Sequence, residues 1–242
     1  MNKLLVILLL FATAIPSQGL LRAISGADNL KSYFPFRKEV DNTFGAVPSG
    51  ADISATASTG KSLPTITDEN ILNVAASQLM YYTISSSDLA DEGTYTIWVN
   101  AMSEDVSDTG SMLFLSPLSA TLDSNIYVEL DWGDSKVRHR WDDNTLGYSK
   151  VASTQSDDTW YWIRAVKSGS GSGNWVNVRV YADDNGRVGA EVVNKQGANK
   201  DFDVWDPAEL SLHFGNDNAG DDPTHIEEVW IYSDAHHGAP RP

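Results

Sequence analysis

The sequence predicts an all-β protein, a sandwich of two antiparallel sheets in one domain that follows a signal peptide. Segments with strand-like patterns recur at intervals of about 8 to 15 residues along the chain. Clusters of Gly, Asp, Asn and Ser separate these segments, and the periodicity of helices is nearly absent. Only residues 85–92 are compatible with a short helix or turn.

Residues 1–19 have the pattern of a secretory signal peptide. Lys3 supplies a positive charge, residues 4–12 an apolar core, and residues 16–19 a small-residue exit. The apolar run is shorter than the roughly 18 to 20 residues that a membrane-spanning helix needs. We therefore expect a secreted, extracellular protein without a membrane span. Its sandwich domain is predicted over residues 28–234, with a flexible tail at 235–242.

The composition argues against two classes of partner. The net charge is −16, whereas a protein that binds a phosphate backbone needs a basic surface. Nucleic acid and anionic membrane surfaces are therefore not expected partners. The chain has no cysteine, so an exported sandwich must be stable without disulfides.

Three segments in the first half read as strands. Residues 30–36 form an aromatic run, and residues 78–84 read as a second strand. In residues 94–102 apolar residues at odd positions alternate with a more polar set at even positions, and Trp98 belongs to the more polar set. A large aromatic residue there predicts a strand that is covered on both faces.

Residues 126–141 read as a hairpin with its turn at 132–135. Asp131 then faces Lys136, and the opposite-charge pairs share one sheet face, where each contributes roughly 0.2 to 1 kcal/mol. The expected partners are Glu129 with Arg138, Tyr127 with Arg140, Leu130 with Val137, Val128 with His139, and Ile126 with Trp141.

The order of elements in residues 160–232 resembles one fold family. An aromatic strand, a glycine-serine turn, a strand ending in Tyr181, an Asn-Gly hairpin and the closing sequence Glu-Glu-Val-Trp-Ile-Tyr follow one another. This order is similar to the laminin G-like branch of the concanavalin A-like jelly rolls. The resemblance implies a jelly-roll sandwich that handles glycans or mediates adhesion. It also implies that the closing strand, with Val229 and Ile231 on one side and Trp230 and Tyr232 on the other, lies beside residues 33–36.

Three carboxylates are the candidates for catalysis. Glu129, Asp131 and Asp134 resemble the Glu-x-Asp-x-x-Glu signature of family 16 glycoside hydrolases, which implies a nucleophile, an assisting residue and an acid/base in that order. Asp134 stands where that family has Glu. The alternative is structural, because the charge ladder of the predicted hairpin explains Glu129 and Asp131 without chemistry.

Five residues are the candidates for glycan binding. Trp132, in the predicted turn, and Trp205, before a proline, are expected to be exposed, while Trp98, Trp160, Trp162 and Trp230 are expected to fill the core. The remaining candidates lie on the charged face of the hairpin. They are Tyr127, Arg138 and Arg140.

One loop is the candidate for a cation. Residues 216–222 are rich in carboxylate and amide oxygens, the ligands that Ca²⁺ prefers, and laminin G-like modules often bind Ca²⁺ in rim loops. The same residue types also make ordinary turns. The expected ligands are Asn216, Asp217, Asn218, Asp221 and Asp222. His139 and His213 are expected to be hydrogen-bonded in the interior, and no histidine spacing indicates zinc.

The sequence favours a secreted, non-catalytic domain that binds an extracellular polysaccharide or a glycosylated surface. Two other classes stay open. One is a glycoside hydrolase or polysaccharide lyase of the same fold, and the other is a structural protein of a surface layer, filament or virion. The oligomeric state does not follow from the sequence.

Overall fold

The structure is a computed structural model of the chain. It describes residues 30–34, 36, 43–46, 52–54, 56–67, 71–85, 94–108, 110–117, 126–143, 147–150, 155–168, 175–198, 209–215, 223–234 and 239–240. The predicted signal peptide and most of the 85–92 segment lie outside this set. Among the described residues, no helix has the length and apolar character that crossing a membrane requires.

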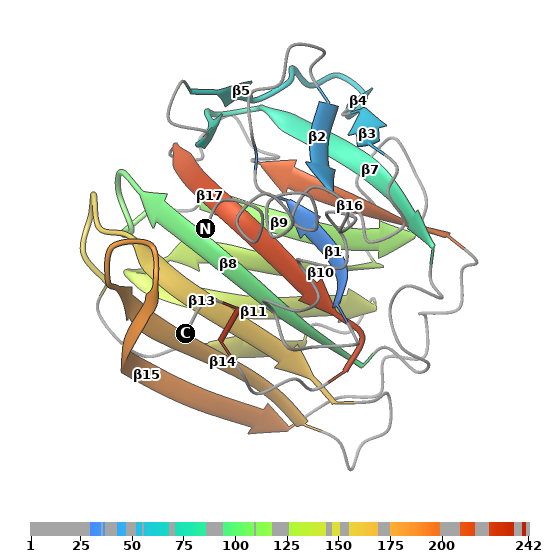
Figure 1. The fold of residues 1–242 in the computed structure, drawn as a ribbon. Helices are drawn as coiled ribbons and strands as arrows, with labels where there is room; N and C mark the ends of the chain where they lie inside the picture. Colours follow the sequence, from blue (N-terminus) through green and yellow to red (C-terminus); the bar gives the residue numbers. More distant parts are fainter. Residues whose placement is uncertain are drawn as a thin grey trace, which may run out of the picture.

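The described strands form two sheets, and every strand pairing within them is antiparallel. The first sheet has the order β15-β14-β13-β8-β17-β1-β2-β3 (Figure 1). Strand β6, itself paired with β5, joins this sheet at β17. Its strands are β1 (Leu30–Phe34), β2 (Thr43–Ala46), β3 (Asp52–Ser54), β5 (Thr65–Ile66), β6 (Leu72–Val74), β8 (Tyr95–Ser103), β13 (Tyr161–Lys167), β14 (Trp175–Asp183), β15 (Val188–Ala198) and β17 (Thr224–Tyr232).

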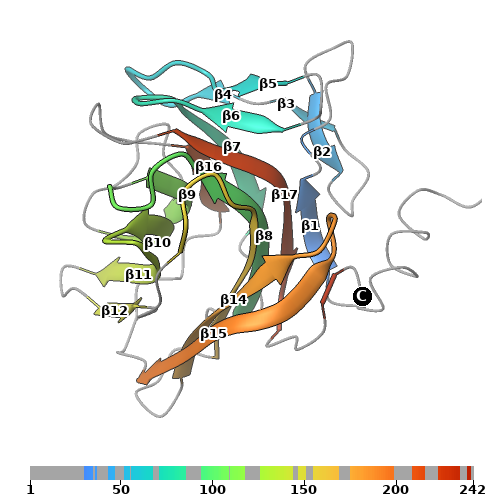
Figure 2. The same cartoon turned by 90° about the vertical axis from the view of Figure 1, so that its left-hand side faces the viewer.

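The second sheet has the order β12-β11-β10-β9-β16-β7-β4. Its strands are β4 (Thr56–Ala57), β7 (Leu79–Ser85), β9 (Gly110–Pro117), β10 (Ile126–Gly133), β11 (Lys136–Asp143), β12 (Gly147–Lys150) and β16 (Glu209–Gly215). Figure 2 shows the two layers side by side, with β9 to β12 in one and β8, β14, β15 and β17 in the other. The predicted fold class, a two-sheet antiparallel β-sandwich, is confirmed.

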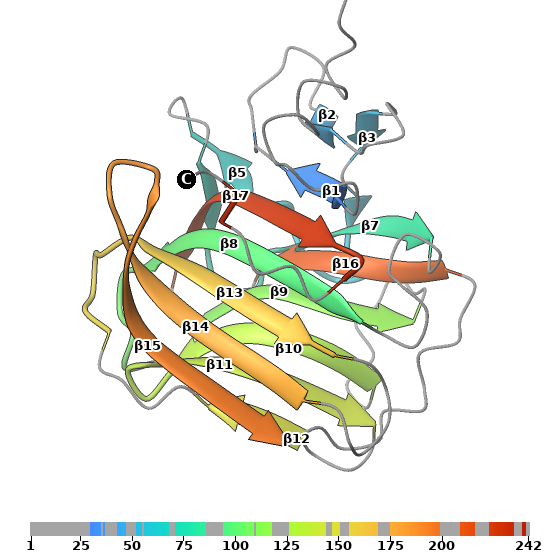
Figure 3. The same ribbon diagram turned by 60° about the horizontal axis from the view of Figure 1, so that its bottom comes forward.

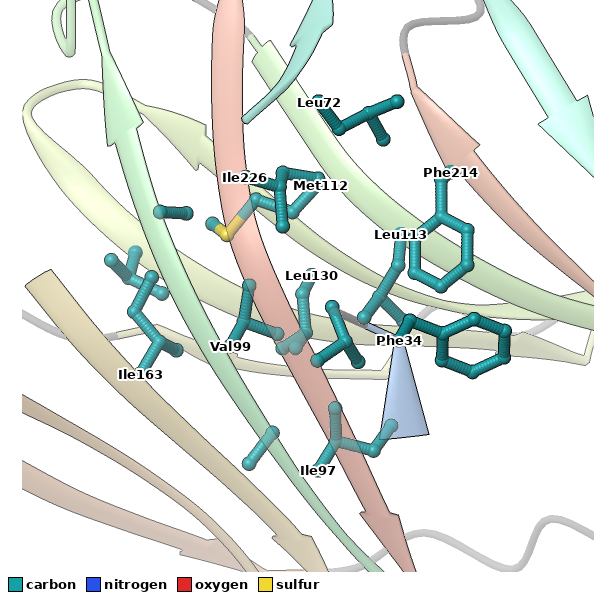
Figure 4. Close-up of a cluster of buried hydrophobic side chains, with 14 of the residues drawn as sticks. Phe34, Leu72, Ile97, Val99, Met112, Leu113, Leu130, Ile163, Phe214 and Ile226 are labelled. Atoms are coloured by element: carbon teal, nitrogen blue, oxygen red, sulfur yellow. The ribbon is translucent and has the colours of Figure 1, made fainter. Parts of the chain in front are cut away.

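The main core lies between the sheets and is built by alternation along the strands. In β8, Ile97 and Val99 point inward, and Ile163 of β13 and Leu130 of β10 join them (Figure 4). All four side chains have no exposed surface. Because the side-chain period of a strand is two, the residues between them must face the outside of the sandwich.

A second apolar cluster covers the outer face of the first sheet, the face turned away from the main core. We call it the aromatic cluster. It consists of Tyr33, Trp98, Trp162, Trp230 and Tyr232, all of them buried. The prediction that the tryptophans fill the sandwich core is therefore wrong for Trp98, Trp162 and Trp230. Their alternation with Ile97, Val99, Ile163 and Val229 places them on the opposite face.

The closing strand is arranged as predicted. β17 pairs with β1, where Trp230 lies opposite Tyr33, and with β8 on its other side. Val229 and Ile231 belong to the main core, while Trp230 and Tyr232 belong to the aromatic cluster. Both faces of β17 are thus covered, which accounts for four large side chains in succession.

The β10–β11 hairpin has the predicted faces but a different register. Asp131 pairs with Arg138 rather than Lys136, and the two central turn residues are Asp134 and Ser135, with φ of 55° and 56°. The physical reason lies outside the hairpin. The amides of Asp134 and Ser135 donate to the carbonyls of Ser107 and Val106, at 3.3 and 2.7 Å, so a distant loop fixes the turn.

Candidate functional site

The predicted catalytic carboxylates Glu129 and Asp131 lie on the outer face of the second sheet. Asp131 accepts hydrogen bonds from Nε and Nη2 of Arg138, at 2.9 and 2.6 Å. The Asp131 side chain is fully buried, and that of Arg138 is 13% exposed. A carboxylate held in this way by a guanidinium serves as a structural anion rather than as a proton donor.

Glu129 is also buried, with 2% of its surface exposed. Its Oε1 accepts a hydrogen bond from the Ser111 hydroxyl at 2.8 Å. Glu129 lies opposite Arg140 and not opposite Arg138, so the predicted pair of Glu129 and Arg138 is wrong. Because its side chain is buried, Glu129 does not line an open surface.

The third carboxylate does not join the other two. β10 ends at Gly133, and Asp134 is exposed in the turn with a left-handed backbone. A strand presents alternate residues to one face, but a turn residue leaves that alternation. The three-carboxylate arrangement of family 16 hydrolases is therefore not assembled among these residues.

The predicted glycan-binding residues do not form one exposed site among the described residues. Trp132 has no exposed surface and packs in the main core, so its predicted exposure is wrong. Arg138 is occupied by Asp131 and by the carbonyl of Trp132, at 2.8 Å. Tyr127 and Arg140 hold strand positions in β10 and β11, and their side chains lie outside the described residues. Trp205 also lies outside them.

The expected Ca²⁺ ligands Asn216, Asp217, Asn218, Asp221 and Asp222 lie outside the described residues. Within the described part of the chain, no group of His, Asp and Glu side chains is arranged to hold a metal ion. The two predicted interior histidines are both buried. Nε2 of His139 lies 2.8 Å from the Tyr95 hydroxyl, and Nδ1 of His213 lies 3.2 Å from the Ser58 hydroxyl.

A different surface gathers polar side chains around a half-buried aromatic ring. It lies on the outer face of the first sheet over β14 and β15, which run side by side at one edge of that sheet (Figure 3). Strand β14 sends Val178 and Val180 into the main core. The residues between them, and their partners on β15, point outward. We call this set the polar platform, and it consists of Asn177, Arg179, Tyr181, Asp183, Glu191 and Asn194.

Hydrogen bonds within the polar platform fix its side chains. Asn177 donates through Nδ2 to Oδ1 of Asn194 at 2.8 Å, and Arg179 donates through Nε to Oδ1 of Asn177 at 3.1 Å. Arg179 also reaches Oε2 of Glu191 at 3.3 Å, where both side chains are about one-third or more exposed to solvent. A chain of three contacts thus fixes these side chains, of which Asn177 is buried while Glu191 and Asn194 are exposed.

Tyr181 links the polar platform to the aromatic cluster. Its ring is half-buried and lies over the buried Trp98 ring, with centroids 5.4 Å apart and an interplanar angle of 31°. Arg164 lies over the same indole, with its guanidinium carbon 5.8 Å from the ring centroid. Burial lowers the pKa of Arg164, and the hydrogen bond and charge of Tyr181 act in the opposite direction.

A tight turn holds the end of the platform. Asn185 and Gly186 have φ of 54° and 78°, as the Asn-Gly signal predicts for a two-residue hairpin. Gly186 donates its amide to Oδ2 of Asp183 at 3.1 Å, and Asn100 donates through Nδ2 to Oδ1 of Asp183 at 2.9 Å. The turn therefore orients a carboxylate across β13 toward Asn100 of strand β8.

Sequence reasoning did not identify the platform, although a signal was present. In residues 177–183 the polar residues Asn, Arg, Tyr and Asp alternate with Val, Val and Ala, which marks one wet and one dry face. That alternation does not show that Tyr181 stacks on a tryptophan from another strand. Only the register of β8, β13 and β14 brings the two rings together.

No family model and no curated protein sequence matches this chain. Solved structures do. A protein of unknown function from Shewanella oneidensis matches with a TM-score of 0.57 at 11% identity, over 92% of this chain and 97% of that protein. The binding domain of botulinum neurotoxin serotype D matches with a TM-score of 0.56 at 12% identity, over 87% of this chain.

The serotype D domain has also been solved in complex with N-acetylneuraminic acid. That structure matches with a TM-score of 0.55 at 13% identity, over 89% of this chain and 50% of that domain. This chain spans about half the length of the toxin domains that it matches. At such low identities the likeness shows a common fold, a β-sandwich of two antiparallel sheets.

Proposed function

We propose that this protein is a secreted, non-catalytic carbohydrate-binding domain of the laminin G-like, concanavalin A-like jelly-roll class. Its ligand is an extracellular polysaccharide or a glycosylated surface, and its binding surface is the polar platform. One observation carries the proposal. The half-buried Tyr181 ring lies beside a preformed network of donors and acceptors built by Asn177, Arg179, Glu191 and Asn194.

This combination suits a sugar. A pyranose has an apolar face that stacks on an aromatic ring and a rim of hydroxyl groups that both donate and accept hydrogen bonds. Rigid aromatic side chains with a few fixed polar groups are the usual means of holding such a ligand. The platform carries one cation, Arg179, which is paired with Glu191, and a second carboxylate, Asp183, whereas the whole chain carries −16. Botulinum neurotoxin domains of the same fold, one of them in complex with N-acetylneuraminic acid, support a glycan partner.

The carboxylates support binding over hydrolysis. A retaining glycosidase needs two accessible carboxyl groups about 5 to 5.5 Å apart, one of them able to give up a proton. Asp131 is tied to Arg138, Glu129 is buried against Ser111, and Asp134 stands apart in a turn. The proposal also includes Ca²⁺ bound by the loop at 216–222, which the EDTA arm of the experiment below addresses.

A glycan array tests the proposal, run with the native chain and with Tyr181→Ala, each with and without EDTA. We expect the native chain to bind a defined set of glycans and Tyr181→Ala to lose about tenfold or more in affinity, since the ring on which the sugar stacks is removed. Tyr81→Ala is the matched control. Tyr81 is another half-buried tyrosine, but it lies on the second sheet beside His213.

Three outcomes decide the matter. Equal losses for Tyr181→Ala and Tyr81→Ala would show that the platform is not the binding surface. An absence of glycan binding by a folded native chain would overturn the proposed function. Binding that survives EDTA would remove Ca²⁺ from the proposal and leave the platform in it.

A further inference from the structure

The buried aromatic cluster and the polar platform lie on the same face of the first sheet and meet at Tyr181. Tyr33 and Trp230 lie with ring centroids 4.0 Å apart, and Trp98 lies 6.4 Å from Trp162 and 5.4 Å from Tyr181. Tyr181 packs against the cluster and also belongs to the platform. A ligand that stacks on Tyr181 therefore meets the edge of a much larger aromatic area.

A short segment from the far end of the sequence covers part of that area. Ala239 packs against the aromatic cluster, and Pro240 is buried. The segment leaves the sheet close by, because the Thr96 hydroxyl on β8 donates to the carbonyl of Asp234 at 2.8 Å. Both residues lie in the region where the sequence predicts a flexible tail.

The cover leaves polar atoms of the cluster unsatisfied. Nε1 of Trp98, Nε1 of Trp162 and Nε1 of Trp230 are buried, and within the described part of the chain they donate to no acceptor. Oδ1 of the fully buried Asn100, on the same face, accepts no hydrogen bond there either. Each buried, unpaired polar group costs about 1 to 3 kcal/mol. Four on one sheet face are more than a well-satisfied interior contains.

Building on the proposed function, we infer that the aromatic cluster is a second saccharide subsite and that Ala239 and Pro240 are its displaceable cover. The Ala239 methyl supplies apolar contact with the cluster, and Pro240, the next residue, is buried. Proline has no amide hydrogen and adds no side-chain acceptor. A neutral oligosaccharide supplies the same apolar contact, and its hydroxyl oxygens accept from the three indole nitrogens while a hydroxyl hydrogen reaches Asn100.

The cover makes binding at the cluster a competition. If the covered state dominates, the apparent affinity for a long saccharide is reduced by the fraction of molecules that are open. The affinity for a short saccharide that occupies only the platform is not reduced in this way. The cover thus distinguishes long chains from short ones and couples release of the 239–240 segment to binding.

The experiment weakens the cover and measures affinity for saccharides of two lengths. The probes are cellohexaose, maltohexaose and chitohexaose, each compared with its disaccharide by calorimetry. Ala239→Asp places a charge against the indoles, and Pro240→Gly is a milder second variant in case the first fails to fold. Ala75→Asp is the matched control, because the same change is made at an exposed alanine.

We expect Ala239→Asp to bind at least one hexasaccharide about tenfold more tightly than the native chain, with disaccharide affinity unchanged, as for a cover closed about nine times in ten. Ala75→Asp should match the native chain. In ¹⁵N-tryptophan-labelled protein, the indole N–H signals of Trp98, Trp162 and Trp230 should shift when the hexasaccharide is added.

The results distinguish a failure of the second subsite from a failure of the proposed function. If the native chain binds saccharide through Tyr181 while Ala239→Asp and Pro240→Gly keep native affinity for the hexasaccharides, the cover is a fixed part of the fold. The subsite is then wrong and the proposed function stands. If folded native and variant chains bind no saccharide of either length, both proposals fall.

Discussion

Asp131 and Arg138 form a two-point ion pair across β10 and β11 in which the carboxylate is fully buried. The guanidinium bends back over the turn, where it also donates to the Trp132 carbonyl. A Cβ at Gly133 would collide with the Arg138 guanidinium, so the glycine makes this path possible. The pair explains why a charged residue stands in the middle of a covered strand.

Removing the cation should destabilise the fold strongly. Arg138→Met leaves the Asp131 carboxylate buried without its guanidinium, and breaking such a pair typically costs about 3 to 5 kcal/mol. The matched control is Arg179→Met, which breaks an exposed pair with Glu191 and should cost less than about 1 kcal/mol. Urea unfolding measures both. Equal costs for the two variants would show that the burial of Asp131 does not set the energy.

The alternation of apolar residues predicted the fold class and the two faces of the closing strand, and the resemblance to jelly rolls placed that strand beside residues 33–36. The closing strand has large side chains on both faces, Val229 and Ile231 on one and Trp230 and Tyr232 on the other. Both faces therefore had to be covered, and in the structure they are. Alternation fixes faces, but it does not fix register. The β10–β11 turn lies one residue further along than predicted because carbonyls of Val106 and Ser107 hold it.

The candidate site was harder to predict for a related reason. Trp132 was expected in a turn and therefore at the surface, but the shifted register returns it to the strand and to the core. The contact between Tyr181 and Trp98 depends on two successive strand registers through β13. Both the burial of Trp132 and the contact of Tyr181 with Trp98 depend on residues far away in the sequence, so no short sequence pattern encodes them.

Truncating either face of β17 should destabilise the protein. Ile231→Ala removes a side chain from the main core and should cost about 2 to 5 kcal/mol, and Trp230→Ala, in the aromatic cluster, should cost about 3 to 5 kcal/mol. Leu63→Ala is the control, because Leu63 is 43% exposed. Thermal and urea unfolding report the costs. A small effect at Trp230 alone would mean that the outer face of the strand contributes little to the fold.

Stability should fall in acid because of His139. Burial first, and then the charge of Lys167, lower the pKa of His139 to about 3. The unfolded imidazole has a pKa of about 6.5, so the unfolded chain takes up the proton first as the pH falls. The contribution is complete above about pH 6.5 and is lost as the pH falls toward 3.

The difference between native and His139→Gln unfolding free energies isolates this effect from the titration of carboxylates. We expect the native value to fall more steeply than the variant value between pH 6.5 and 3, by up to about 1.4 kcal/mol per pH unit. Tyr95→Phe keeps the imidazole and removes the hydroxyl near Nε2, so it should keep the native steepness. Parallel curves for native and His139→Gln chains would contradict the assignment.

The hairpin turn at Gly186 allows a test that separates backbone strain from packing. Gly186 has a φ of 78°, and no atom lies within 4 Å of the position that a Cβ would take. Gly186→Ala therefore adds no clash and should cost about 1 kcal/mol, since alanine disfavours the left-handed region. Gly186→Asn should cost less, because asparagine tolerates this backbone. Equal costs for both in urea unfolding would contradict a backbone origin.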